Sequence, residues 1–277
     1  MRGMISLTFD DALDVHLDNA VVELNDAGLR GTFYAHLSAE SLFKRATDWR
    51  AVAAAGHEIG NHTVFHPAAE DKNWVTTGNA IEYYTLDRMR MELDLANRWL
   101  ESIDSCTDRT FAFPCSNPTI GRPGPLVRAC NHYGLRFTRW PGMIQRAGLD
   151  FGSTCQSYAP LLPEYFVAGR GGGLTFEMTP PPIKAFDQYQ LPSAACDGHS
   201  TKQMQDFVGR CLDAESWAIL QFHGIGGGHH MDCSLENFRQ LTRWIADHHA
   251  DQVVTVRQGA QQIYSSTSLP KSTQNRA

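Results

Sequence analysis

The chain has 277 residues, of which 42% are hydrophobic and 19% charged, an ordinary globular composition whose length fits one large domain or two small ones. A formal net charge of −6 leaves no excess of Lys or Arg to neutralise phosphates, which argues against a general binder of nucleic acids or anionic membranes. Seven cysteines without CxxC spacing predict reduced, mostly buried thiols rather than a zinc ribbon or a disulfide framework.

The N-terminal region shows no export or membrane signal. No apolar run is long enough to cross a bilayer, and the first predicted strand starts so close to Met1 that a signal peptide has no room. The sequence as it stands therefore predicts a cytoplasmic protein, although a signal that had been removed, as in a secreted or periplasmic protein, would leave the same pattern.

The first half of the chain alternates short β-rich runs with helical patterns. The run MISLTFD predicts a strand, and the apolar residues after it recur at helical spacing up to Gly28, a stop signal. By the same criteria we expect strands over 31–37, 57–62, 109–114 and 135–140, and helices over 48–56, 86–100 and 124–134.

The second half is less regular. Gly and Pro are dense over 169–186 and again near 191–199, which predicts long loops, with GRGGG at 169–173 and TPPP at 179–182 as turns. Order returns with a helix over 204–211, a strand over 217–224, a helix over 235–245 and a strand over 252–256. No linker or repeat is visible, so we expect one domain over 1–265 and a flexible tail over 266–277.

This alternation predicts an α/β fold, a parallel sheet or barrel with helices outside. In such folds the chemistry lies at the carboxyl ends of the strands. Asp10 and Asp11 end the first strand, His62 follows another and His223 ends a third. We expect these side chains to meet on one rim.

The segment GNHTVFHP places His62 and His66 four residues apart, a spacing at which two imidazoles can reach one metal ion. It is not the HExxH metalloprotease motif, because Thr63 stands where the glutamate would be. An acid from TFDD would complete two His and one Asp, the other acid would act as a general base, and His223 would supply a proton. Singly, HxxxH is more often a surface pair and Asp-Asp a helix cap; the combination at strand ends favours a metal site.

The segments SLTFDD, GTFYAHL, GHEIGNHTVFHP and LQFHGIG resemble, in this order, the signatures of the polysaccharide deacetylases with NodB homology, carbohydrate esterase family 4. The resemblance implies a distorted (β/α) barrel with an incomplete strand count. It also implies a divalent metal, usually zinc, with cobalt, nickel or manganese as alternatives.

The resemblance assigns a role to each matching residue. Asp10 corresponds to the general base, Asp11, His62 and His66 to the metal ligands, and His223 to the general acid. It implies that a water activated on the metal removes acetyl groups from a carbohydrate, most often N-acetylglucosamine units and otherwise O-acetyl xylan. Relatives of the fold open cyclic amides or remove formyl groups, so these substrates stay as alternatives.

The third motif departs from the family pattern, which makes this a divergent branch. In RTFAFPCS, Ala112 stands at the position of the arginine that orients the base, and Cys115 replaces a tyrosine. The Cys115 backbone N–H still suits an oxyanion, since that contact needs no side chain. Arg139, at the end of a predicted strand, is the candidate for the missing charge, with Arg136 second.

Two rival functions remain open. Two His and one carboxylate also describe non-haem Fe(II) oxygenases, but those sites use HxD spacing in all-β folds. A carbohydrate binder that has lost turnover is disfavoured because the acids and histidines of the motifs are all present. The Gly-rich GIGGGHH lacks the residues of a phosphate loop and predicts a flexible loop, with His229 or His230 beside the substrate.

Overall fold

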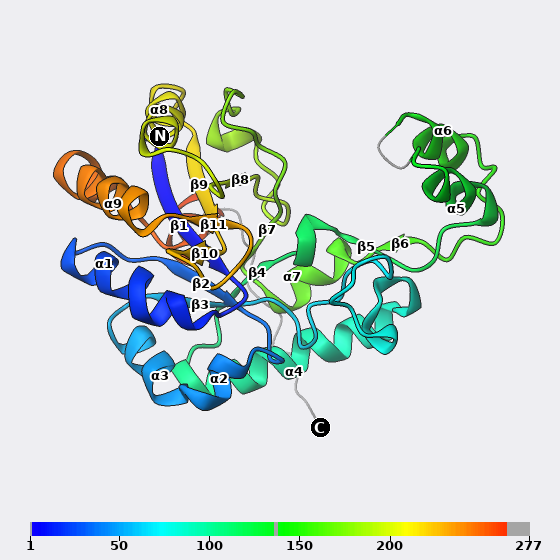
Figure 1. The fold of residues 1–277 in the computed structure, drawn as a ribbon, viewed down its shortest axis with the longest axis horizontal. Helices are drawn as coiled ribbons and strands as arrows, with labels where there is room; N and C mark the ends of the chain where they lie inside the picture. Colours follow the sequence, from blue (N-terminus) through cyan, green and yellow to red (C-terminus); the bar gives the residue numbers. More distant parts are fainter. Residues whose placement is uncertain (1, 136–137, 265–277) are drawn as a thin grey trace.

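The computed structural model describes residues 2–135 and 138–264 and is built on a seven-stranded sheet in which every neighbouring pair of strands is parallel (Figure 1). The sheet curves into an open half-barrel, as the alternation of strands and helices predicts. The order across it is β7 (Ala168–Arg170), β4 (Thr110–Ala112), β3 (Glu58–Asn61), β2 (Thr32–Ala35), β1 (Met4–Asp10), β9 (Trp217–Phe222) and β8 (Ala194–Ala195).

Helices cover the outer face of this sheet, and their buried side chains join those of the strands in one large cluster. The helix that follows β1 begins as a π-helix at His16–Ala20 and continues as α1, and Gly28 ends it with φ of +69°. The covering helices are α1 (Val21–Asp26), α2 (Glu40–Lys44), α3 (Ala46–Ala54), α4 (Leu86–Asp104), α8 (Thr201–Asp213) and α9 (Leu235–His249).

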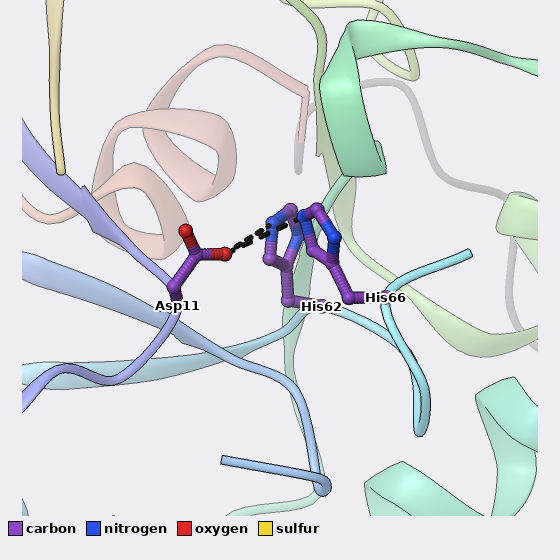
Figure 2. A group of neighbouring side chains, drawn as sticks. All are labelled: Asp11, His62 and His66. Carbon is purple, nitrogen blue, oxygen red and sulfur yellow. Dashed lines mark ion pairs between the residues drawn. The ribbon is translucent and has the colours of Figure 1, made fainter. Parts of the chain in front are cut away.

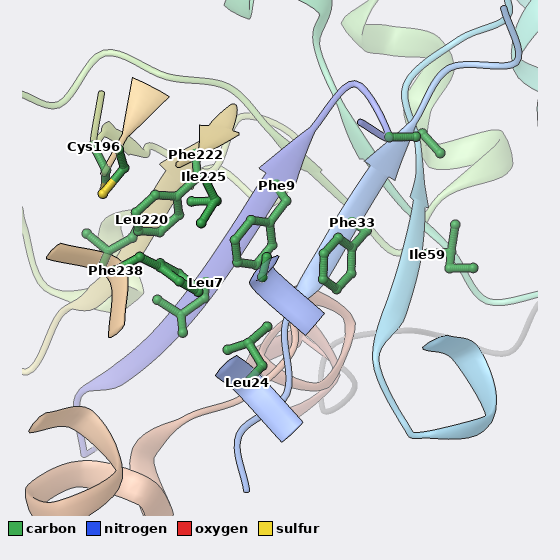
Figure 3. Close-up of a cluster of buried hydrophobic side chains, with 14 of the residues drawn as sticks. Leu7, Phe9, Leu24, Phe33, Ile59, Cys196, Leu220, Phe222, Ile225 and Phe238 are labelled. Atoms are coloured by element: carbon green, nitrogen blue, oxygen red, sulfur yellow. The ribbon is translucent and has the colours of Figure 1, made fainter. Parts of the chain in front are cut away.

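Strand β1 shows which side chains face the helices and which face the interior of the half-barrel. Successive side chains point to opposite faces, so Leu7 and Phe9 pack outward against the helices. Phe9 lies between Phe33 and Phe222, with ring centroids 4.7 and 5.4 Å away (Figure 3). The alternate residues, which end with Asp10, face the interior of the half-barrel. The last residue of β1 therefore projects a carboxylate inward.

The two edges of the sheet, β7 and β8, leave the barrel open, and the chain between them bridges the gap in two places. Arg170 of β7 forms an isolated bridge with Leu191, and Leu174 forms another with Ala194 of β8. A second apolar cluster, which contains Ala168, Leu191 and Trp217, fills the interior on this side. Edge β7 is thus held close to the barrel interior.

An arm, residues 121–155, leaves the body after β4 and returns before β7 (Figure 1). The short antiparallel strands β5 (Thr119–Ile120) and β6 (Gln156–Ser157) form its base, and α5 (Pro125–His132) and α6 (Trp140–Arg146) form its tip. Figure 1 shows the tip standing apart from the sheet and its helices. The remaining elements are α7 (Leu162–Tyr165), β10 (Gly224–Ile225), β11 (Asp232–Cys233) and α10 (Val256–Tyr264).

Two predicted strands were wrong. At 135–140, Trp140 begins helix α6, whose first turn accommodates a proline, while residues 136 and 137 lie outside the described part of the chain. At 252–256 only Val253 pairs with the sheet, through one bridge to Ile5, and α10 begins at Val256. Thr255 and Gln258 exchange hydrogen bonds across the start of α10, so TVRQ is a capping box.

The predicted turn at GRGGG was also wrong in its first two residues, which end strand β7. The expected tail, 266–277, lies outside the described residues. Among the described helices, none combines the length and the apolar character needed to span a bilayer.

Candidate active site

The polar side chains predicted at strand ends do meet at one rim. Asp10 and Asp11 end β1, His62 follows β3 and His223 follows β9. The backbone is strained at this rim: among the described residues, eight other than glycine have positive φ, and six of them lie here. These six are Asp11, Ala12, Thr63, His66, Cys115 and Ser116.

Asp11, His62 and His66 form a group suited to a metal ion (Figure 2). The Asp11 Oδ1 atom lies 3.6 Å from His62 Nε2 and 3.4 Å from His66 Nε2. Ligand atoms about 2.0–2.1 Å from a tetrahedral zinc ion would lie about 3.3 Å apart, so these separations fit. Asp11 Oδ1 is buried and has no hydrogen-bond partner, an arrangement that a bound cation would satisfy. The residues present therefore fit a divalent metal.

The protonation of these ligands suits the same role. His62 Nδ1 lies 2.8 Å from the Ala112 carbonyl oxygen, which can only accept, so Nδ1 carries the proton and the Nε2 lone pair faces Asp11. Burial lowers the pKa of His62 to about 4 although Asp10 and Asp11 act to raise it, so the ring is neutral at pH 7. Burial acts to raise the pKa of Asp11, but His66 and His62 outweigh it and hold that pKa below its ordinary value.

Asp10, the neighbour of Asp11, is paired with Arg170 inside the half-barrel. Arg170 Nη2 lies 2.6 Å from Asp10 Oδ1 and 2.5 Å from Oδ2, and Gln221 Nε2 donates to Oδ2 over 3.0 Å. Burial acts to raise the pKa of Asp10, but the Arg170 guanidinium outweighs it, so the carboxylate is ionised at neutral pH. An ionised carboxylate next to the metal group is what a general base requires.

The prediction that Arg139 supplies this charge was wrong. Arg139 is exposed and precedes α6 in the arm, and Arg136 lies outside the described residues. Arg170 is instead the register partner of Ala112 across the β4–β7 pair. The guanidinium thus comes from the strand beside the one that the family motif indicates. Arg170 ends a strand, the same signal that identified Asp10, but flanking glycines disguised that strand as a turn.

His223 lies close to Asp10 and has a carboxylate partner that sequence reasoning missed. Its Nδ1 lies 3.2 Å from Asp197 Oδ2, and its Nε2 lies 4.0 Å from Asp10 Oδ2. Burial acts to lower the pKa of His223, but the hydrogen bond to Asp197 and the charge of Asp10 outweigh it and raise that pKa. His16 Nε2 donates to the His223 carbonyl oxygen over 2.7 Å and fixes the backbone there.

The other predicted site residues also lie near this rim. Cys115 follows β4 and is exposed. Its φ of +51° changes the direction of the chain at this residue. The His229 ring stacks on His223 with centroids 5.3 Å apart, and the His230 ring lies 4.2 Å from His229. The loop GIGGGHH therefore borders the site, as the sequence predicts.

Comparison with known proteins identifies the family of this chain. Residues 1–136 match the family model for polysaccharide deacetylase, a span that contains Asp10, Asp11, His62, His66 and the divergent third motif. This chain belongs to the polysaccharide deacetylase family. The match ends within the arm, so it bears on Asp10 and the metal group but not on His223.

Solved structures agree with the fold. A putative polysaccharide deacetylase from Mycobacterium smegmatis superposes with a TM-score of 0.59 at 12% identity, over 100% of this chain and 95% of that one. A family 4 acetyl xylan esterase from Clostridium thermocellum, solved with a cobalt ion, gives 0.52 at 16% identity, over 94% of this chain and 91% of that one. These likenesses establish a NodB-like distorted barrel.

One curated relative is a gellan lyase from a Bacillus species, 29% identical over 139 residues. The match covers 44% of this chain but spans only 5% of that much longer protein. The similarity is therefore to a small part of the lyase.

Proposed function

We propose that this protein is a metal-dependent hydrolase that removes acetyl groups from a carbohydrate, with N-acetylglucosamine-type units as the substrate. The observation that carries the proposal is the placement of three groups on one rim. These are the candidate ligands Asp11, His62 and His66, the ionised Asp10, and the protonatable His223 only 4.0 Å from Asp10.

A bound divalent cation would supply Lewis acidity, polarising the acyl oxygen and lowering the pKa of a water molecule. Asp10, kept ionised by Arg170, accepts the proton of the attacking water. His223, whose pKa is raised by the hydrogen bond to Asp197, donates a proton to the leaving atom. The Cys115 backbone N–H is our candidate for a second oxyanion contact.

The state of His223 favours an amide substrate over an ester. An amine is a poor leaving group unless its nitrogen is protonated, whereas an alkoxide depends less on an acid. Asp197 and Asp10 both raise the pKa of His223, so the imidazole stays protonated up to a higher pH than a free histidine. We therefore place N-deacetylation ahead of O-acetyl xylan-type ester hydrolysis and of cyclic-amide or formyl hydrolysis.

Zinc is the metal we propose, because two imidazoles and one carboxylate with open positions are typical of catalytic zinc. Cobalt, nickel and manganese accept the same ligands. Metal analysis of the purified protein, followed by reconstitution with each ion, distinguishes them.

Acetate release tests the proposal, measured over chitooligosaccharides, N-acetylglucosamine, acetyl-xylan and cyclic ureides. We expect Asp11→Ala, His62→Ala and His66→Ala to lose the metal, since each removes a ligand. Asp10→Asn is the matched control: it should keep the metal and lose turnover by about a hundredfold or more, the worth of a general base.

Other outcomes would contradict the proposal in distinct ways. Full turnover of Asp10→Asn would remove Asp10 as the base. Carbohydrate binding by the metal-loaded protein without release of any acyl group would indicate a non-catalytic binder. Oxygen uptake with Fe(II) and a 2-oxo acid would indicate an oxygenase.

A further inference from the structure

The arm, residues 121–155, is richer in exposed apolar side chains for its length than the rest of the described chain. Fifteen large apolar side chains are exposed among the described residues, and seven of them belong to this arm. Tyr133 and Phe151 are the most exposed, at 77% and 71%. The full set is Leu126, Tyr133, Leu135, Trp140, Met143, Leu149 and Phe151.

The arm also lacks a core that would hold it together. Among its described residues, Val127 is the single large apolar side chain that is buried. Helices α5 and α6 have eight and seven residues, too short to be stable in water without packing against something else. Exposed apolar patches of this kind mark interaction surfaces, so a partner that covers the arm is expected.

Charge indicates what that partner is. The sequence of the arm contains five arginines, one aspartate and no lysine or glutamate, a net charge of +4. The whole chain carries −6, so the rest of the chain carries −10. A basic, apolar arm on an acidic body is complementary to the body of a second copy.

Other occupants fit less well. The C-terminal segment 265–277 contains Leu269 as its only large apolar residue and carries Lys271 and Arg276, of the same sign as the arm. An anionic membrane would attract the arm but repel a body of net charge −10.

The body offers a matching surface on the outer face of α4, which we call the α4 strip. Met91 and Leu95 are 66% and 55% exposed, although they lie on a helix whose other side is packed against the sheet. Trp99, one turn further, continues the strip and packs against exposed Phe43 with ring centroids 5.1 Å apart. The exposed carboxylate of Asp87 lies one turn before Met91, at one end of the strip, and is 3.4 Å from Arg90 Nη1.

We propose that two copies of this chain associate by docking the arm of each on the α4 strip of the other. The apolar side chains of the arm cover Met91, Leu95 and Phe43, and an arginine of the arm approaches the carboxylate of Asp87 at the end of the strip. A two-fold axis makes the two contacts equivalent, so the assembly closes at a dimer. The association is independent of the proposed hydrolase activity.

Sedimentation velocity on the full chain tests the dimer. We expect a dimer at micromolar concentration that weakens as salt is raised, because part of the attraction is between exposed charges. Phe151→Glu in the arm and Leu95→Glu in the α4 strip should each raise the dissociation constant at least about tenfold by placing a charge in an apolar contact. Val22→Glu, at an exposed apolar position on α1 outside both surfaces, is the matched control and should leave the dimer intact.

A mixing experiment separates docking from misfolding. The Phe151→Glu protein keeps an intact α4 strip and the Leu95→Glu protein keeps an intact arm, so an equimolar mixture should form a heterodimer through one intact contact. A monomeric wild type, a dimer that survives either substitution, or two variants that fail to associate on mixing would each overturn the proposal. Monomers that bind anionic vesicles through the arm would overturn it in favour of a membrane.

Discussion

Replacing Arg170 with methionine isolates the ion pair that we expect to control the base. The pair is almost fully buried, with side-chain exposures of 1% for Arg170 and 3% for Asp10. Without the guanidinium, Asp10 keeps one neutral side-chain donor, Gln221 Nε2 at 3.0 Å. Losing an adjacent cation raises a carboxyl pKa by about 1–3 units. Leaving the other charge buried and unpaired costs about 3–5 kcal/mol of folding free energy.

The sign of the pH effect follows from the direction of the Asp10 shift. In the wild type the pKa of Asp10 is lowered, so the pair stabilises the fold above the unfolded pKa of about 3.9 and loses that contribution as the pH falls. In Arg170→Met burial is no longer opposed by the cation and the pKa rises. A general base must be ionised, so the acidic limb of kcat/KM should move to higher pH by about 1–3 units.

The assay is the pH profile of acetate release by metal-loaded protein, together with thermal unfolding. Arg139→Met is the matched control for the pH profile, since Arg139 is exposed in the arm and should leave the acidic limb where it is. In the double variant Ala112→Arg/Arg170→Met, the acidic limb should move part of the way back to its wild-type pH. Residues 112 and 170 are register partners, so an arginine at 112 can bring a guanidinium near Asp10. An unchanged acidic limb in Arg170→Met, or an equal shift in Arg139→Met, would refute this account of the base.

Three further predictions concern the acid, the metal and the core. Asp197→Asn removes the hydrogen bond that raises the pKa of His223, so the basic limb of kcat/KM should move to lower pH; a profile that keeps its basic limb would exclude the pair. Chelation should lower the melting temperature of the wild type but not of His66→Ala, because a metal ion at a hundredfold excess over its Kd adds about 2.7 kcal/mol to the free energy of unfolding. Equal melting temperatures of the wild type with and without chelator would count against the metal site. Phe9→Ala should cost about 3–5 kcal/mol in chemical denaturation, because Phe9 is fully buried between Phe33 and Phe222; a cost near zero would show that the cluster refills the cavity.

Much of the candidate site at the rim could be predicted, because its residues follow strands whose apolar pattern is clear in the sequence. The run before Asp10 is apolar for most of its length and is followed by a helix at regular spacing, so both the strand and its end are marked. His62 and His223 follow strands in the same way. In a parallel sheet all such ends share one edge, which brings together residues more than 200 positions apart.

The missed residues follow strands too short to have a pattern. Arg170 ends a strand of three residues that contains Gly169, and Asp197 follows a strand of two. These strands exist because β4 and β9 offer them a hydrogen-bonding edge, which is tertiary information. The arm was missed for the same reason: its helix α5 was predicted, but nothing local indicates that the helix leaves the body.

The pairing of Arg170 with Asp10 ties the outermost strand of the sheet to its centre. β7 is the outermost strand of the sheet: β4 pairs with it on one side, and on the other it has one isolated bridge, to Leu191, and edges are where a fold opens first. If β7 separates from β4, the guanidinium leaves with it, and the carboxylate on β1 loses its charge partner while the rest of the barrel is still folded. If Asp10 is the base that we propose, its reactivity depends on the stability of the sheet edge, and heating should abolish turnover before the rest of the chain unfolds.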